Sequence, residues 1–134
     1  GATVGPFAHL RPNSHLGQDV HIGNFVEVKN STLGAGVKSG HLTYIGDADL
    51  GRDINIGCGT IFVNYDGKKK HRSTVGDQAF IGCNANIVSP VKIGDQTFIA
   101  AGTTVTHDVP DQALAISRVK QDNIPNYWQK FSKK

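Results

Sequence analysis

The sequence predicts an all-β protein in which short parallel strands coil around a triangular prism. Aliphatic residues recur every six positions from Val4 to Val28 and again from Val75 to Val105. In seventeen such hexads, the residue after the inward one is glycine eleven times, which lets the chain turn there. A period of six suits one short strand plus one tight corner. About a hundred periodic residues, at roughly eighteen per coil, therefore predict between five and six stacked coils around a thin aliphatic core.

Each strand is expected where an aliphatic residue points into the prism. In the first run, the inward residues are Val4, Leu10, Leu16, Ile22 and Val28. The phase continues through Leu33, Ile45, Leu50 and Ile56, with two five-residue steps and with Ser39 and Phe62 as weaker members. The second run has Val75, Ile81, Ile87, Ile93, Ile99 and Val105. Between the runs, residues 64–72 break the period and contain the turn signal Asp66-Gly67, so we expect a loop that leaves the prism.

The periodic domain is expected to span residues 1–110, and residues 111–134 are expected to form a C-terminal arm. The repeat stops beyond Pro110, and residues 125–131 predict a short helix with Pro125 in its first turn. The domain carries nine Lys/Arg and nine Asp/Glu, whereas the arm carries five Lys/Arg and two Asp. A neutral body argues against a nucleic-acid surface, because such a surface needs a dense cationic field.

The composition also indicates where in the cell the protein is expected. The chain is 38% hydrophobic without a long apolar run, so no membrane span is expected. Its two cysteines, Cys58 and Cys83, follow glycines at predicted corners and lack metal-ligand spacing, and no export signal is evident. We therefore expect reduced thiols and a cytoplasmic protein.

Residues eighteen apart should lie directly above one another in such a prism, which brings together Arg11 and Lys29. Two like charges on adjacent strands normally repel each other. A bound dianion such as phosphate would remove that cost; alternatively, the two long side chains simply extend into solvent. The basic residues from Lys68 to Arg72 also have two interpretations: they bind a polyanion, or they form a basic loop that is exposed to solvent.

The next column places Glu27 beside Tyr44, with His41 slightly earlier on the same face. A histidine here is either a general base suited to neutral pH or an inert corner residue. Three other histidines are six apart, so they point away from one another on three faces, and one chain cannot gather them around zinc. They are His9, His15 and His21. A metal shared between chains, as in the prism-shaped carbonic anhydrases, remains an alternative.

Seven segments carry a more specific signal: residues 5–8, 10–12, 23–29, 40–47, 64–67, 100–105 and 113–118. They resemble the left-handed parallel β-helix acyltransferases. The hexapeptide repeat alone is common to many of these enzymes, but the segment around His41 followed by Asn64-Tyr65 is specific. The resemblance implies a left-handed coil and a homotrimer with active sites between subunits. It implies an N-acetyltransferase that moves the acetyl group of acetyl-CoA to the amine of glucosamine 1-phosphate, on the route to UDP-N-acetylglucosamine and the cell wall, without a metal.

The same resemblance implies roles for individual residues. His41 would be the general base, and Glu27 a supporting group beside it. The residues expected to hold glucosamine 1-phosphate are Arg11 and Lys29 at the phosphate and Tyr44 and Asn55 at the sugar. Those expected near acetyl-CoA are Asn64, Tyr65, Lys70, Ala101 and Arg118, with Lys70 reaching an adjacent site from its loop. Cys83 and Cys58 stand near the same co-substrate, where the family commonly has serine and a small alanine.

Two alternatives to this acetyltransferase come from different classes. One is another hexapeptide acyltransferase with a different acceptor, which substrate profiling would distinguish. The other is a non-catalytic prism that only brings three chains together. The stacked Arg11 and Lys29 favour the sugar-phosphate enzyme, because neither a scaffold nor a carbon dioxide hydratase needs a phosphate grip.

Overall fold

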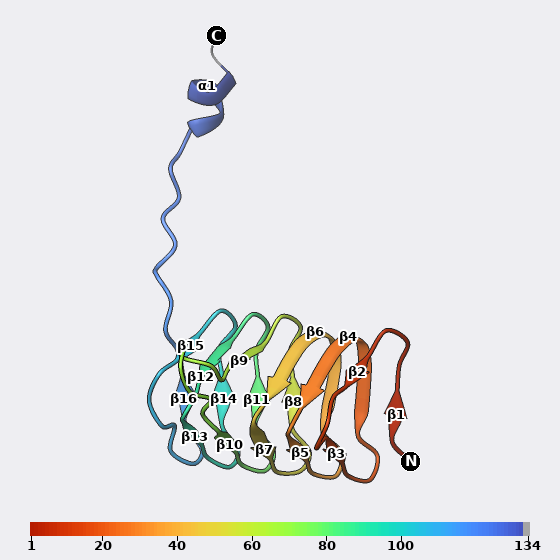
Figure 1. The fold of residues 1–134 in the computed structure, drawn as a ribbon. Coiled ribbons are helices and arrows are strands. Elements are labelled where there is room, and N and C mark those ends of the chain that lie inside the picture. The colour runs from red at the N-terminus through yellow and green to blue at the C-terminus, as the bar shows by residue number, and fades with distance from the viewer. Residues whose placement is uncertain (133–134) are drawn as a thin grey trace.

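The computed structural model describes residues 1–132, as a prism of stacked coils followed by an extended arm (Figure 1). The first face holds β1 (Thr3–Val4), β8 (Asn55–Ile56), β11 (Phe80–Ile81), β14 (Phe98–Ile99) and β16 (Leu114–Ala115). The second holds β2 (His9–Leu10), β9 (Ile61–Val63), β12 (Asn86–Val88) and β15 (Thr104–Val105). The third holds β3 (His15–Leu16), β5 (Thr32–Leu33), β7 (Ala48–Leu50), β10 (Ser73–Val75) and β13 (Lys92–Ile93).

Two longer strands join the first and second faces. They are β4 (His21–Lys29) and β6 (Lys38–Gly46). Strand β4 pairs with both β1 and β2, and β6 pairs with both β8 and β9, so each strand bends across the corner between these faces. We call this corner A, and the corner between the second and third faces corner B. All the strand pairings are parallel, and the predicted left-handed parallel β-helix is confirmed.

The register confirms the predicted columns of inward residues. Leu10 lies opposite Val28, and Val28 lies opposite Ile45. The five-residue steps shorten a coil by one residue without moving the column, so that Leu33 still faces Leu50. The loop at residues 64–72 lengthens the next coil in the same way, because Leu50 pairs with Val75 across it. A parallel ladder tolerates such changes only at corners, where no inter-strand bond is lost.

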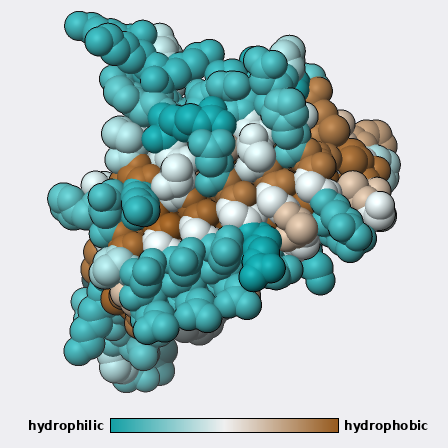
Figure 2. Space-filling model, turned by 90° about the horizontal axis from the view of Figure 1, so that it is seen from below, coloured by the Kyte–Doolittle hydropathy of each residue, from teal (hydrophilic) through white to brown (hydrophobic). Residues whose placement is uncertain are grey.

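The core is one continuous cluster of aliphatic side chains along the prism axis. Phe62 is its bulkiest fully buried member, and it occupies one of the two weaker positions of the repeat. Ser39 occupies the other, and its hydroxyl is buried without a hydrogen-bond partner among the residues that the structure describes. Seen from below in Figure 2, a narrow row of apolar residues runs along the surface between broad polar bands.

Corner A carries bulky residues in the left-handed backbone region. Phe7, Phe25 and Leu42 have φ values of 61°, 59° and 52°, and the rings of the two phenylalanines stack with centroids 5.4 Å apart. Later coils place Gly59 and Gly102 at equivalent points, where positive φ carries no side-chain penalty. The three apolar side chains are more than half exposed, so this end of corner A presents an apolar ridge.

The structure differs from the sequence prediction at the C-terminal end. The ladder passes Pro110, because Leu114 and Ala115 pair with Phe98 and Ile99 and so continue the first face. The six-residue period does not predict this last coil, because the coil contains sixteen residues where eighteen are usual, so that Ile93 pairs with Val109. Helix α1 spans Tyr127–Ser132, and Pro125 lies before it, not in its first turn. Within the described residues, no helix is long and apolar enough to cross a membrane.

Candidate functional site

Most of the predicted site residues gather at two neighbouring corners of the prism. Corner B brings together one residue from each of several coils and the loop at 64–72: Arg11, Lys29, Asp47, Asn64 and Lys70. Tyr44 reaches this group from the end of β6. Corner A stacks His41, Cys58, Cys83 and Ala101 in successive coils. Asn55 lies apart from both groups, exposed on the first face between Lys38 and Phe80.

Each of the two stacked cations has its own carboxylate. Nη1 of Arg11 lies 2.9 Å from Oε2 of Glu27, and Nζ of Lys29 lies 3.2 Å from Oδ1 of Asp47. Neither interpretation of the Arg11 and Lys29 pair, a bound dianion or side chains that extend into solvent, took account of these two carboxylates, because they lie outside the column of the two cations. Lys70 adds a third cation from the loop, so the cluster keeps an excess of positive charge.

Asp47 is the centre of the hydrogen-bond network at corner B. Its carboxylate accepts from Lys29, from Nδ2 of Asn30 at 2.8 Å and from Nδ2 of Asn64 at 2.8 Å. Only 5% of the residue is exposed. Burial raises the pKa of Asp47, but the hydrogen bonds from Asn30, Asn64 and Lys29 outweigh burial and hold the pKa below its ordinary value. Sequence reasoning missed the role of this residue, although it ends one of the segments that carry the resemblance, residues 40–47.

The loop at residues 64–72 is held in one shape by its own side chains. Oδ1 of Asp66 accepts from the backbone N–H groups of Lys68 and Lys69 at 2.7 Å each, and Oδ2 lies 2.7 Å from Nε2 of His71. His71 first, and then the two backbone donors, hold the pKa of Asp66 well below its ordinary range. At the end of the loop, Arg72 grips both carboxylate oxygens of Asp49, at 2.8 and 2.6 Å. The loop that the sequence predicted is thus confirmed, and it is anchored to the third face.

The anchored loop brings Lys70 to Lys29. The ammonium group of Lys29 lowers the pKa of Lys70, and Arg11 acts in the same direction with a smaller effect. A shallow pocket of about 260 Å³ at this place is lined by Lys29, Asn30, Asp47, Lys70, His71 and Arg72. Cations that disfavour one another's charge beside an open pocket form a site suited to an anion.

His41 is exposed on β6, opposite Asn24 of the coil before it. Its backbone carbonyl accepts from the hydroxyl of Thr43 at 2.9 Å, whereas its ring makes no hydrogen bond to any described residue. Glu27, expected beside it, is hydrogen-bonded to Arg11 instead. The imidazole is therefore free to meet a ligand at the bend of β6, three residues before Tyr44.

Small residues line corner A on the C-terminal side of His41. Cys58 is partly buried and Cys83 is exposed, and both are free thiols. A Cβ at Gly57 or Gly82 would lie 2.6 Å from the backbone nitrogen of the next coil, so these glycines are needed for the coils to approach. Arg118 reaches back from the arm and donates to the carbonyl of Ala101 at 3.0 Å. Tyr65 lies apart, in the loop, and donates to the carbonyl of Gly67.

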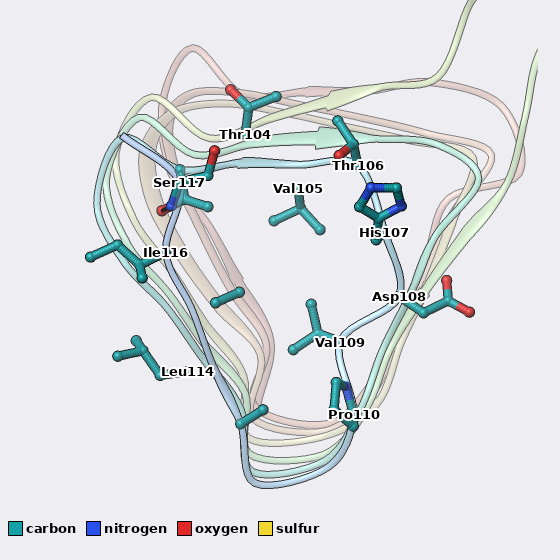
Figure 3. A pocket seen from close by; sticks show the side chains of 13 residues that line it. Thr104, Val105, Thr106, His107, Asp108, Val109, Pro110, Leu114, Ile116 and Ser117 are labelled. Carbon is teal, nitrogen blue, oxygen red and sulfur yellow. Dashed lines mark hydrogen bonds between the residues drawn. The ribbon is translucent and has the colours of Figure 1, made fainter. Parts of the chain in front are cut away.

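Another pocket lies at the C-terminal end of the prism. It has a volume of about 440 Å³ and is lined by residues 103–110 and 113–117. Val105 and Val109 point into it, and Leu114 and Ile116 point away on the outside of the coil (Figure 3). The pocket is the open end of the prism interior and contains none of the predicted site residues. Within residues 1–132, no group of three or more His, Cys, Asp or Glu side chains is placed to hold a metal ion.

Comparisons with known sequences agree with this architecture. Residues 72–107 match the family described as bacterial transferase hexapeptide (six repeats). The chain is 65% identical over 120 residues to the bifunctional protein GlmU of Caldicellulosiruptor saccharolyticus, a match that covers 90% of this chain and 26% of that protein. It is 58% identical over 128 residues to the bifunctional protein GlmU of Clostridium perfringens, covering 96% of this chain and 28% of that protein. The chain thus spans little more than a quarter of the length of these relatives.

Solved structures show the same prism. PerB from Caulobacter crescentus, in complex with CoA and GDP-perosamine, has a TM-score of 0.78 and 27% identity, over 87% of this chain and 54% of that one. The acetyltransferase domain of PglB from Neisseria gonorrhoeae, in complex with acetyl coenzyme A, has a TM-score of 0.76 over 84% of this chain and 53% of that one, and its 21% identity supports the fold alone. The chain is therefore a left-handed parallel β-helix of the hexapeptide-repeat type, similar over nearly its whole length to one segment of the bifunctional GlmU proteins.

Proposed function

We propose that this chain is an N-acetyltransferase that transfers the acetyl group of acetyl-CoA to the amine of glucosamine 1-phosphate. One observation carries the proposal: Arg11, Lys29 and Lys70 converge at corner B, beside Tyr44 near the end of β6, and the same strand presents His41 at corner A. The three cations outnumber the two carboxylates, Glu27 and Asp47, so a net positive charge remains to attract a dianion. A sugar phosphate held there would extend toward corner A, where the imidazole lies.

The chemistry needs few protein groups. The amine of glucosamine 1-phosphate is largely protonated at neutral pH, so a base must free its lone pair before it can attack the thioester carbonyl carbon. His41 is the candidate base, because its ring has no other hydrogen-bond partner among the described residues. His41 takes one proton from the ammonium group and releases it to water. Once the neutral nitrogen has added to the carbonyl carbon, His41 takes a second proton from that nitrogen and passes it to the departing CoA sulfur as the carbon–sulfur bond breaks. Neither a covalent enzyme intermediate nor a metal takes part in this scheme.

Corner A is the proposed site of acetyl-CoA. Its small residues Cys58, Cys83 and Ala101 follow His41 coil by coil, which suits a thin pantetheine chain lying along the prism. Arg118 lies at the far end of this row, where a phosphate of CoA needs a cation. The similarity to PerB, whose structure contains CoA, supports acetyl-CoA as the co-substrate.

We also propose that the protein is a homotrimer. The apolar ridge at corner A and the apolar residues of the arm are uncovered in a single chain: Val119 is 95% exposed and Trp128 is 71% exposed. Patches of this kind usually mark contacts with another chain. Analytical ultracentrifugation of the full chain should give the mass of three copies, and a chain truncated after Val119 should dissociate. An unchanged trimer after truncation would mean that the arm does not hold the copies together.

The decisive experiment is an acetyl transfer assay in which the sugar phosphate is detected by mass spectrometry, so that Cys58 and Cys83 cannot interfere. The His41→Ala variant should lose activity by about 100-fold or more, whereas His15→Ala, which changes an exposed histidine on the third face, should not. Arg11→Gln should raise the KM for glucosamine 1-phosphate, with Arg52→Gln as the matched surface control. Full activity of His41→Ala would contradict its role as the base. A folded trimer without product would favour a non-catalytic scaffold.

A further inference from the structure

Asp47 is the only buried carboxylate in residues 1–132. It lies at a corner of the prism, where most polar residues are exposed. It lies at corner B with a φ of 53°, between Gly46 at the end of β6 and Ala48 at the start of β7. A buried carboxylate is costly unless its hydrogen bonds are satisfied. Here they are fully satisfied: Oδ1 accepts from Lys29 and Asn30, and Oδ2 accepts from Lys29 and Asn64.

The partners of Asp47 belong to different parts of the site. Lys29 lies at the anion pocket, at the end of β4. Asn64 begins the loop, and its amide nitrogen donates both to Asp47 at 2.8 Å and to the hydroxyl of Tyr44 at 3.1 Å. Because the Tyr44 oxygen accepts that bond, its own hydrogen remains available to a ligand. The carboxylate of Asp47 thus fixes the ammonium group of Lys29 directly, and it fixes the hydroxyl of Tyr44 through the amide of Asn64.

Gly46 supplies an independent observation. A Cβ built at this position would overlap the hydroxyl of Tyr44 and would lie 2.7 Å from Nδ2 of Asn64. The Tyr44 side chain therefore folds back over the backbone of Gly46 to reach Asn64. The absence of a side chain at Gly46 serves the packing of Tyr44, since Gly46 is not among the glycines with positive φ.

We propose that Asp47 is a positioning residue that sets the Lys29 ammonium and the Tyr44 hydroxyl at a fixed separation, and so selects acceptors whose phosphate and sugar hydroxyls match that spacing. This inference rests on the proposed function and adds a specificity-determining residue to it. Asp47 acts through Lys29 and Asn64. Its negative charge also limits the attraction of the pocket for other anions, because without it Lys29 and Lys70 would present an uncompensated double charge.

The test compares Asp47→Asn with Asp77→Asn in the full chain. Asparagine has nearly the same shape as aspartate. Both oxygens of Asp47 accept hydrogen bonds, however, so the NH₂ group of asparagine would face a donor, and the hydrogen bond at that position would be lost. We expect kcat/KM for glucosamine 1-phosphate to fall by about 10- to 100-fold. Inorganic phosphate should inhibit this variant at lower concentrations than the wild type. Asp77, an exposed carboxylate paired with Arg52, lies away from both corners, and its replacement should change neither quantity.

A double-mutant cycle with Tyr44→Phe separates positioning from a general loss of structure. If Asp47 acts through Tyr44, its replacement should cost much less in the Tyr44→Phe background than alone. Additive effects would overturn the inference, as would wild-type kinetics of Asp47→Asn in an otherwise active enzyme. If wild-type enzyme gives no product at all, the proposed function and this inference fall together. If Asp47→Asn does not fold, Asn30→Gly removes one donor while keeping the positive φ, and it should lower kcat/KM several-fold with the same coupling to Tyr44.

Discussion

Replacing Gly46 with alanine tests whether the Tyr44 hydroxyl is placed by its packing over this glycine. The added methyl group overlaps the end of the Tyr44 side chain and crowds the amide of Asn64. The obstacle is the tip of a long side chain and not backbone, so the ring can swing away. In doing so it gives up the 3.1 Å hydrogen bond from Asn64.

The expected cost to stability is small. Losing one neutral hydrogen bond costs about 0.5–1.5 kcal/mol. Alanine recovers about 0.4–1 kcal/mol, because it restricts the unfolded chain more than glycine does. The free energy of unfolding should therefore change by about 1 kcal/mol or less. The KM for glucosamine 1-phosphate should rise by about tenfold, which corresponds to about 1.4 kcal/mol for a lost sugar contact.

Gly40→Ala is the matched control for stability, because it lies on the same strand and a Cβ there meets nothing within 4 Å. Both variants are to be compared by denaturant unfolding, and Gly46→Ala also by steady-state kinetics with each substrate varied in turn. An unchanged KM for glucosamine 1-phosphate in a folded Gly46→Ala protein would refute the reasoning. So would a loss of stability several times that of the control, because it would mean that backbone packing, and not Tyr44, requires the glycine.

Three further predictions follow from individual residues. Ser39→Ala removes a buried hydroxyl that lacks a described partner, so the free energy of unfolding should rise by about 1 kcal/mol in denaturant titrations. Because the folded-state pKa values of Asp47 and Asp66 are depressed, their stabilisation is present above about pH 4 and is lost as the pH falls further; Asp47→Asn should therefore flatten the acid limb of a stability–pH curve. Iodoacetamide should alkylate the exposed Cys83 faster than Cys58, and acetyl-CoA should slow the reaction at Cys83; equal rates with and without acetyl-CoA would place the co-substrate elsewhere.

The sequence was sufficient to predict the prism because each inward residue obeys the same local rule. Val28, Ile45 and Phe62 follow from spacing alone, and the register places each one beside the next. The last coil was missed because its step is sixteen residues, which puts Val109 and Ala115 out of phase with the run that ends at Val105. A corner can gain or lose residues without disturbing the pairing of the strands, so the six-residue period does not predict the length of each corner.

The site was less predictable, because its contacts cross columns. The pairing of Glu27 with Tyr44 follows from the coil length and is confirmed by the register. The hydrogen bonds of Asp47 are different: its partners at 29 and 30 belong to the coil before it, and its partner at 64 belongs to the coil after it, where the inserted loop begins. Only the three-dimensional position of a corner residue with positive φ reveals that it can reach all three. Resemblance pointed to Lys29, Tyr44 and Asn64 as candidate ligand contacts, but it did not point to the carboxylate of Asp47, which binds Lys29 and Asn64.

The stacking of coils also determines which insertions and deletions this protein can survive. Removing one residue from a strand would exchange inward and outward side chains in everything that follows, up to the next corner that can compensate. Duplicating or deleting a whole coil among β11 to β15 would instead leave Lys29, Asp47 and Asn64 at the same separations, since those residues lie in earlier coils. An engineered chain of a different length should therefore keep the proposed acceptor site unchanged, whereas the proposed row for acetyl-CoA, which includes Cys83 and Ala101, would change in length.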